Sequence, residues 1–206
     1  MKDILIKTSD NKGSNGVQEI IFVTTNKGKI AYAQENLKNI KVLPYNAELI
    51  EPRSDDLKEI AKQKVIQAYN IVKKPCIALD AGFFIREWNG FPRAYVNPML
   101  ETIGIKGIIK LMEGIEDRYC EFRECLAYYD GIEIRFFESK SPGMISHSIR
   151  GKEKENQWSE LWYIFEPKNF DKTIAEFNEE DFVEYQRLEE ITCMKKFGDW
   201  YELQNK

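Results

Sequence analysis

The order of apolar and polar positions predicts a mixed α/β fold in the first half of the chain. An apolar strand at 20–23 leads into a helix at 26–40, where apolar residues recur at helical spacing. A short strand is expected at 41–43, a second helix at 54–73 and an apolar strand at 75–79. Strand and helix patterns therefore alternate, as they do in mixed α/β domains.

The second half predicts helices followed by a β-hairpin. Asn97-Pro98 begins a helical stretch, because proline is favoured at the first position of a helix. Asp130-Gly131 separates two strand-like runs and is typical of a tight hairpin turn. The expected elements are one or two helices at 97–114, a strand at 118–128, a strand from 132, a strand at about 143–149 and a helix at 179–197.

Length and composition favour one domain. The chain has 206 residues, of which 43% are hydrophobic and 13% aromatic, enough for a packed core in one domain or in two lobes. We expect residues 1–17 to be a flexible lead-in and residues 18–206 to form a single two-lobed domain. The net charge of −4 predicts no general affinity for nucleic acid. No secretory signal and no run long enough for a membrane helix is seen, so no membrane partner is expected.

The cysteines predict free thiols rather than a zinc site. The four cysteines form no CxxC pair, and His147 is the single histidine. Cys76 falls in the apolar strand at 75–79, where a thiol would be buried. Free buried thiols fit a reducing compartment, so we expect a cytoplasmic protein.

The most informative polar residue in the chain is Asp80. It follows the apolar strand at 75–79 and precedes the small pair Ala81-Gly82 and the apolar run at 83–85. A carboxylate at the end of a buried strand is costly to bury unless it is paired or binds a metal, and small neighbours leave room for a ligand. Asp80 is therefore a candidate for handling a metal ion or a water. A simple hairpin turn at this point is the alternative.

A second candidate site lies where the first strand meets the first helix. Thr24-Thr25-Asn26 forms a polar turn, and Lys27 and Lys29 add positive charge at the start of the helix. A helix N-terminus of this kind favours an anion, although the spacing of a phosphate-binding P-loop is absent. The alternative is an ordinary asparagine cap of the helix.

The third candidate is a lysine on an apolar helix face. In the helix at 54–73, Lys64 lies seven residues after Leu57 and four after Ile60, within one apolar stripe. Asp56 and Glu59 have the spacing of a capping box at the start of this helix. A lysine in such a stripe either meets an anion or extends its ammonium to the edge of the core.

Taken in order, these segments resemble the inosine triphosphate pyrophosphatase family, the non-canonical purine NTP pyrophosphatases. The resemblance covers about residues 19–196 and is most specific in the first half. The matching motifs are T-x-N-x-x-K at Thr24–Lys29, a carboxylate at Glu51, a helical lysine at Lys64, the central aspartate motif at Leu79–Gly82, G-x-P-G at Gly90–Arg93, and K-T-x-A-E at Lys172–Glu176.

The chain also departs from the family pattern. Leu79 replaces an acidic residue, Ala81 replaces serine, and Arg93 replaces the last glycine of G-x-P-G. The segment G-F-G-Y-D-P, expected near 157–165, is here QWSELWYIF. The family's K-N falls near Asp181-Phe182, and its Ser-His-Arg becomes Tyr185-Gln186-Arg187. The phosphate end of the site is thus retained and the base-reading end is rebuilt. Trp158, Trp162 and Tyr163 would either stack on a ligand ring or pack in the core.

The resemblance implies an elongated mixed sheet flanked by helices, with two lobes and a central cleft. It implies hydrolysis of a nucleoside triphosphate to the monophosphate and pyrophosphate with Mg²⁺, and a homodimer. In this assignment Glu51 and Asp80 hold Mg²⁺ or orient the water, and Asp80 and Lys64 are the catalytic residues. Thr24, Asn26, Lys29 and Lys64 bind the triphosphate, and Arg187 reaches the base or a phosphate.

Three functions fit these motifs. The first is an active pyrophosphatase with altered base specificity, and the second is a nucleotide-binding or partner protein that keeps the fold without turnover. A hydrolase for another phosphorylated ligand, such as a modified deoxynucleotide, is the third possibility. The alternatives to an active pyrophosphatase rest on Leu79, which stands where the family has an acidic residue.

Overall fold

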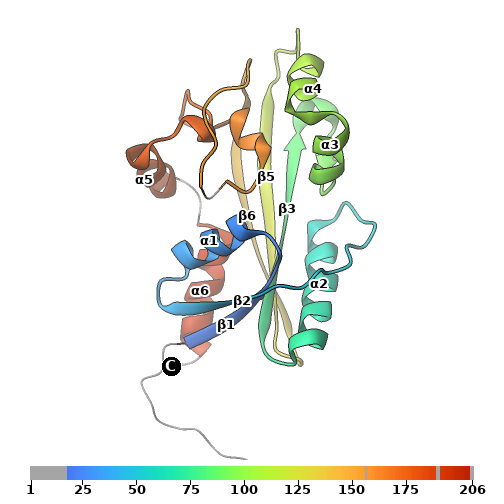
Figure 1. Ribbon diagram of the computed structural model, residues 1–206, viewed down its shortest axis with the longest axis vertical. Coiled ribbons are helices and arrows are strands. Elements are labelled where there is room, and N and C mark those ends of the chain that lie inside the picture. The colour runs from blue at the N-terminus through green and yellow to red at the C-terminus, as the bar shows by residue number, and fades with distance from the viewer. Residues whose placement is uncertain (1–17, 156, 189–190, 205–206) are drawn as a thin grey trace, which may run out of the picture.

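The computed structural model describes residues 18–155, 157–188 and 191–204, so the lead-in expected at 1–17 lies outside the described residues. The described chain forms one open, mixed sheet flanked by helices, as the sequence predicts (Figure 1). The strand order is β2-β1-β3-β5-β6-β7, with the short β4 beside β3. β1 runs parallel to β2 and β3, whereas β3, β5, β6 and β7 pair in antiparallel fashion.

The elements have the following bounds. The strands are β1 Gln18–Val23, β2 Ile40–Tyr45, β3 Cys76–Ile85, β4 Pro92–Arg93, β5 Tyr119–Tyr129, β6 Ile134–Ile145 and β7 Phe165–Pro167. The α-helices are α1 Lys27–Asn36, α2 Leu57–Val72, α3 Val96–Thr102, α4 Gly104–Leu111, α5 Glu179–Leu188 and α6 Cys193–Gln204. Short 3₁₀ turns lie at Arg86–Trp88, Glu160–Tyr163 and Ile174–Glu176.

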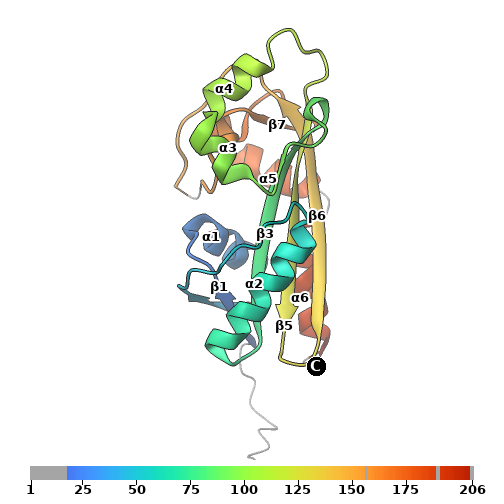
Figure 2. The same cartoon turned by 90° about the vertical axis from the view of Figure 1, so that its right-hand side faces the viewer.

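Three long strands, β3, β5 and β6, run through both lobes and join them (Figure 1 and Figure 2). In the lower lobe, α1 and α6 pack on one face of the sheet and α2 packs on the other. The two faces follow from the alternation of β3, in which Ile77 and Leu79 contact the α1 side and Cys76 and Ala78 the α2 side. In the upper lobe, α3, α4 and the segment 160–185 enclose a separate apolar core.

Helix α2 begins where the sequence places its cap, but through a different contact. The Asp56 side chain accepts a hydrogen bond from the backbone N–H of Lys58 at 2.9 Å. Glu59 does not complete the capping box that its spacing predicts, because it accepts a hydrogen bond from the Gln63 side chain one turn later. Small residues on the buried face, such as Ala61 and Ala68, let α2 lie close to β3.

Strand β3 corrects the expected position of Asp80. The apolar strand expected at 75–79 continues to Ile85, so Asp80 lies in the middle of a ten-residue strand rather than at its end. The reason is β5, which pairs with β3 along its whole length, from Cys76 opposite Tyr129 to Ile85 opposite Cys120. The hairpin turn considered as an alternative at Asp80 is therefore wrong.

Two other elements are shorter than expected. The helix expected at 26–40 ends at Asn36, because Ile40 already pairs with Gln18 in the sheet. The strand expected at 143–149 is only the end of β6, which ends at Ile145 beside the short β7.

The helix expected at 179–197 is two helices, α5 and α6. Phe182 of α5 packs in the upper lobe, while Met194 and Phe197 of α6 pack in the lower lobe. A single straight helix does not reach both cores. None of the helices in the described residues is long and apolar enough to cross a membrane. All four cysteines are free and buried, as the sequence predicts.

Candidate active site

A gap in strand pairing exposes the middle of β3. On one side of β3, β1 pairs with only Cys76 and Ile77, and β4 pairs with only Phe83 and Phe84. Between these pairings, residues 78–82 have no strand partner on that side among the described residues, and we call this stretch the open edge of β3. Asp80 lies at its centre. Backbone and side chains here can therefore contact a ligand between the lobes.

Lys64 bridges two carboxylates beside the open edge. Its Nζ donates to Asp80 Oδ1 at 2.8 Å and to Glu51 Oε1 at 2.6 Å. The side chains of Lys64 and Asp80 are only 13% and 8% exposed, whereas that of Glu51 is 62% exposed. Lys64 thus meets anions rather than extending to the edge of the core. We call Glu51, Lys64 and Asp80 the carboxylate–lysine cluster.

The charge state of Lys64 follows from these contacts. Burial alone would lower the pKa of Lys64, but the charge and hydrogen bond of Asp80, supported by Glu51, hold this pKa above its ordinary value. Lys64 is therefore a firmly cationic group placed between an enclosed carboxylate and an exposed one.

The turn after β1 directs Lys29 toward the same edge. Thr24 Oγ1 accepts a hydrogen bond from the backbone N–H of Asn26 at 3.1 Å, and Asn26 Oδ1 caps α1 by accepting from the N–H of Lys29 at 3.0 Å. The asparagine cap considered as an alternative is therefore present. Lys29 Nζ donates to the carbonyl oxygen of Leu79 at 3.2 Å, on the open edge of β3.

Lys29, like Lys64, is partly buried. Burial lowers the pKa of Lys29, while the negative charge of Asp80 is the largest effect in the opposite direction. Lys29 has no carboxylate within ion-pair distance among the described residues. A partly buried ammonium with three donors and one carbonyl partner is well suited to receive an anion.

Two carboxylates of the cluster could hold a metal ion. Glu51 and Asp80 converge on one point, which the ammonium of Lys64 now fills as a stand-in cation. Among the described residues, no three histidine, cysteine, aspartate or glutamate side chains gather to form a complete protein site. This donor set suits Mg²⁺, which keeps several waters and takes one or two carboxylates plus substrate phosphates.

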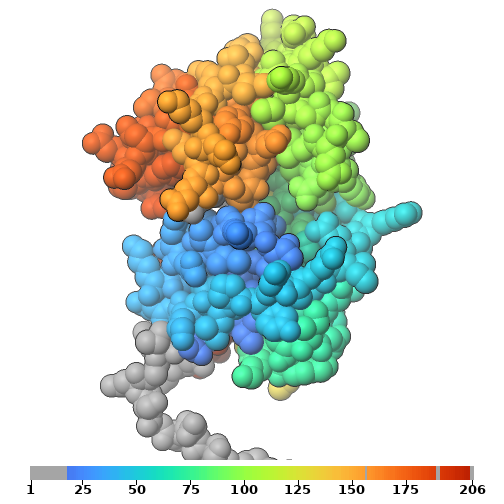
Figure 3. All heavy atoms as spheres, viewed as in Figure 1, coloured from blue at the N-terminus to red at the C-terminus, as the bar shows by residue number. Residues whose placement is uncertain are grey.

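Aromatic rings connect the lobes next to Lys29. The ring of Trp158 stacks on Tyr32 of α1 with centroids 5.9 Å apart and on Phe122 of β5 at 6.4 Å. Lys29 Nζ lies 5.9 Å from the centre of the Trp158 ring. Figure 3 shows α1, in blue, directly beneath the orange segment near residue 160. Trp162, by contrast, packs against the upper core.

The structure does not bring Arg187 to this region. Its guanidinium pairs with Glu184, one turn earlier on α5, at 2.6 Å, and the side chain is 67% exposed. The neighbouring Tyr185 packs against Phe170 and Phe177 in the upper lobe. The role of Arg187 toward a base or phosphate stays a prediction. His147 is exposed, as the sequence allows.

A glutamate that the sequence reading missed lies on β5 beside Lys29. Glu124 is 9% exposed and accepts hydrogen bonds from Tyr32, Ser139 and Cys193. Burial raises the pKa of Glu124. The signal was the alternation of β5, which places position 124 on the same face as Phe122 and Leu126, facing the core.

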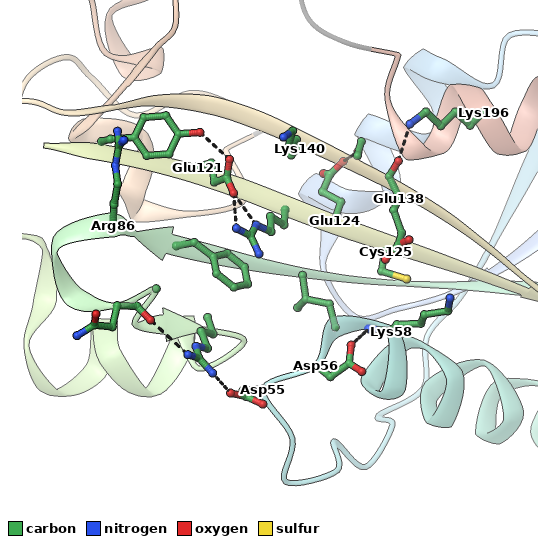
Figure 4. A pocket seen from close by; sticks show the side chains of 18 residues that line it. Asp55, Asp56, Lys58, Arg86, Glu121, Glu124, Cys125, Glu138, Lys140 and Lys196 are labelled. Atoms are coloured by element: carbon green, nitrogen blue, oxygen red, sulfur yellow. Dashed lines mark hydrogen bonds and ion pairs between the residues drawn. The ribbon is translucent and has the colours of Figure 1, made fainter. Parts of the chain in front are cut away.

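A cavity of about 910 Å³ lies on the α2 face of the sheet, beyond the start of α2 (Figure 4). Its three arginines already have partners, since Arg86 pairs with Asp117, Arg93 with Asp55 and Arg123 with Glu121. The carboxylate–lysine cluster does not line this cavity. We therefore place the candidate active site at the open edge of β3.

Comparison with known proteins identifies the family of the chain. The sequence matches the Ham1 family over residues 20–186. It is 36% identical over 186 residues to a dITP/XTP pyrophosphatase of Saccharolobus solfataricus, covering 89% of this chain and 94% of the relative. It is 34% identical over 166 residues to a dITP/XTP pyrophosphatase of Hyperthermus butylicus, covering 79% of this chain and 84% of the relative.

Solved structures agree on the fold. The Staphylococcus aureus Ham1 protein superposes with a TM-score of 0.73 at 20% identity, covering 91% of this chain and 100% of that one. A HAM1 protein from Coxiella burnetii superposes with a TM-score of 0.75 at 18% identity, covering 90% and 98%. These matches confirm the resemblance drawn from the motifs, and the chain belongs to the Ham1 family of inosine triphosphate pyrophosphatase-like proteins.

Proposed function

We propose that this chain is a metal-dependent nucleoside triphosphate pyrophosphatase that converts an NTP to the monophosphate and pyrophosphate. The observation that carries the proposal is Lys64, held by Asp80 and Glu51 beside the open edge of β3, with Lys29 on the same edge. Phosphoryl transfer needs charge neutralisation and a placed water more than a protein nucleophile. The names of the relatives support the same reaction.

The two lysines and the first turn bind the triphosphate in this proposal. Lys29 and Lys64 supply positive charge, and the positive end of the α1 dipole adds to it. Thr24 and Asn26 shape the turn by hydrogen bonds to the backbone, which fixes the direction in which Lys29 leaves α1. Their side chains therefore act on the substrate chiefly by orienting this turn.

Glu51 and Asp80 would hold Mg²⁺. When bound, the ion neutralises charge on the phosphates and favours attack by water. Asp80, enclosed at the centre of the open edge, orients the water toward the α-phosphorus. The oxygen of this water bonds to phosphorus and its proton passes to solvent as the bond to the bridging oxygen breaks, and pyrophosphate leaves.

Base specificity differs from that of the relatives. The segments that would read the base, 159–165 and 185–187, depart from the family motifs, and Tyr185 packs in the upper core. Arg187 contributes to the base or a phosphate only if it leaves Glu184. Inosine and xanthosine triphosphates are therefore not the preferred substrates.

A nucleotide-binding protein without turnover is the second candidate. One observation favours it. Leu79, which precedes Asp80, is buried in the apolar core on the α1 side, and Ala81 adds no polar group to the open edge. The site then has one carboxylate on the strand itself, which is enough to bind a metal–phosphate complex but weakens activation of water.

One screen separates these candidates. The full chain is incubated with each of the common and modified NTPs and dNTPs, including ITP and XTP, with Mg²⁺, and pyrophosphate and monophosphate are measured. Release of both from at least one nucleotide supports the pyrophosphatase. Binding of nucleotides in a parallel calorimetric measurement, with no product from any of them, supports the binding protein.

The proposal includes a cytoplasmic homodimer. The buried free thiols fit a reducing compartment. Phe91 and Tyr95, on either side of β4, are each 42% exposed and provide apolar surface for a second copy. Light scattering on the purified chain tests the dimer, because one chain has a mass of 24.2 kDa and a dimer twice that value.

A further inference from the structure

Strand β5 carries two buried glutamates on opposite faces of the sheet. Glu121 is 6% exposed and Glu124 is 9% exposed. Each accepts a hydrogen bond from a tyrosine hydroxyl, Glu121 from Tyr119 at 2.7 Å and Glu124 from Tyr32 at 3.1 Å. Only Glu124 lies on the face that carries α1. Both pairs join a tyrosine hydroxyl to a carboxylate, but Tyr119 and Glu121 lie on one strand, whereas Tyr32 ties Glu124 to another element, α1.

The Glu124 carboxylate joins three elements at one oxygen. Glu124 Oε2 accepts from Tyr32 of α1 at 3.1 Å, from Ser139 Oγ of β6 at 2.9 Å and from Cys193 Sγ of α6 at 3.4 Å. Leu126 and Met194 lie in the apolar core on the same face, and Glu124 also borders the cavity of about 910 Å³. A carboxylate is costly to bury, and a well-packed apolar residue would serve stability at least as well. The acid therefore points to a role beyond packing.

Tyr32 connects this carboxylate to the candidate active site. Tyr32 and Lys29 lie three residues apart on α1, so their side chains project from the same face of the helix. Lys29 extends from that face to the carbonyl of Leu79 on the open edge of β3. A shift of this turn of α1 would move Lys29 away from the edge.

The negative charge of Glu124 also favours the charged form of Lys29. Lys29 is partly buried, and Glu124 is one of the negative groups that favour its ammonium form, after Asp80. In return, Lys29 favours the carboxylate form of Glu124. The two groups thus belong to one electrostatic neighbourhood although they do not form an ion pair.

We propose that Glu124 is a positioning residue for Lys29, which through Tyr32 holds α1 where the lysine can bind the phosphates of the substrate. This inference rests on the proposed function and deepens it, because it names a residue outside the carboxylate–lysine cluster on which triphosphate binding depends. Such a role leaves the reacting atoms untouched, so it affects KM more than kcat.

The test compares two matched variants of the full chain. Tyr32→Phe removes the hydroxyl that reaches Glu124 and keeps the ring that stacks on Trp158. Tyr119→Phe removes the equivalent hydroxyl that reaches Glu121 on the other face. Binding of inorganic triphosphate with Mg²⁺ is measured by calorimetry. We expect Tyr32→Phe to weaken binding about fivefold, about 1 kcal/mol, and Tyr119→Phe to change it by less than about twofold.

A double-mutant cycle distinguishes positioning from a general structural effect. In a Lys29→Met background, Tyr32→Phe should cause no further loss, because the residue on which it acts is gone. Glu124→Gln, which keeps an acceptor oxygen for Tyr32, should lose less than Glu124→Ala. Melting temperatures of all variants are measured alongside, so that a variant that fails to fold is recognised and Tyr32→Phe carries the result.

Three outcomes contradict the inference. Equal effects of Tyr32→Phe and Tyr119→Phe would show that neither pair serves the phosphate site in particular. A loss from Tyr32→Phe that persists in full in the Lys29→Met background would show that it acts elsewhere. A wild-type chain that binds no triphosphate would contradict the proposed function itself, and this inference with it.

Discussion

The ammonium of Lys64 lies 2.8 Å from a carboxylate oxygen of Asp80, although one side chain leaves a helix and the other leaves the middle of a strand. Both are largely buried, so each neutralises a charge that would otherwise be costly to enclose. Any ligand that takes Lys64 as its own partner, or any cation that takes Asp80, changes this pair. The pair therefore links the stability of the lower lobe to occupation of the site.

Replacing Lys64 tests the phosphate-binding role. Lys64→Met should weaken binding of inorganic triphosphate by more than about tenfold, a loss of about 1.4 kcal/mol or more. The ammonium is the group that would contact phosphate, and methionine has similar length without charge. Calorimetric titration with Mg²⁺ measures the effect. Lys62→Met is the control, because Lys62 is an exposed lysine of the same helix that pairs with Glu59 at 4.0 Å. Equal effects of the two variants would contradict the role.

The same variant tests the buried pair. The apolar stripe alone would predict that methionine is well tolerated in α2. In the structure, however, the substitution removes the cation that pairs with the buried Asp80. Lys64→Met should therefore lower the melting temperature by at least about 4 °C, on the scale of about 2–4 °C per kcal/mol for a chain of this size. Adding Asp80→Asn should restore most of the loss. An unchanged melting temperature in Lys64→Met would show that the pair adds nothing to stability.

Weak discrimination between bases is expected, because segments 159–165 and 185–187 depart from the family motifs. A pocket that hydrogen-bonds one base edge rejects other bases strongly, because its polar groups would be left unpaired. Here Tyr185 packs in the upper core and Arg187 pairs with Glu184. We expect kcat/KM for ITP to exceed that for GTP and ATP by less than about a hundredfold, about 2.7 kcal/mol. A larger ratio would show that other residues supply the family's discrimination.

The raised pKa of Glu124 predicts a pH-dependent stability. A carboxyl group whose folded pKa lies above its unfolded value stabilises the fold fully below the unfolded pKa, and this contribution is lost as pH rises through the folded pKa. The charged and titratable groups that face it are Lys29, Tyr32 and Cys193, from α1 and α6.

The wild type should therefore gain stability relative to Glu124→Gln as the pH falls from 8 toward the ordinary glutamate value of about 4.5. Thermal melts of both proteins across this range give the difference directly. Glu121→Gln serves as the control, because Tyr119 and Arg123 outweigh burial and lower the pKa of Glu121, so its contribution stays nearly constant above the ordinary value and is lost only as the pH falls through and below it. A wild-type advantage over Glu124→Gln that stays constant with pH would contradict the assignment.

The sequence predicts those parts of the site that depend on neighbours along the chain. The turn at Thr24–Asn26 and the apolar stripe of α2 that contains Lys64 are local patterns, and both lie where the sequence predicts them. The sequence also marks Asp80 as a candidate carboxylate, but its place in the middle of β3 depends on pairing with β5, more than forty residues later.

Nonlocal contacts explain what the sequence reading missed. Glu124 accepts hydrogen bonds from Tyr32, Ser139 and Cys193, which are distant in sequence and come together only in the folded core. The division of 179–197 into two helices likewise depends on two separate cores. A single periodic stretch of sequence does not indicate that its two ends pack in different lobes.

The central claim is tested most directly by the products released with Asp80 intact and with Asp80→Asn. The full chain is supplied with Mg²⁺ and the nucleotide that it turns over best, and monophosphate, pyrophosphate and orthophosphate are counted. We predict equal amounts of monophosphate and pyrophosphate from the wild type and less than about a hundredth of that rate from the near-isosteric Asp80→Asn. Asp199→Asn, at an exposed pair with Lys195, should keep the wild-type rate. Orthophosphate as the main product, or full turnover by Asp80→Asn, would contradict the account.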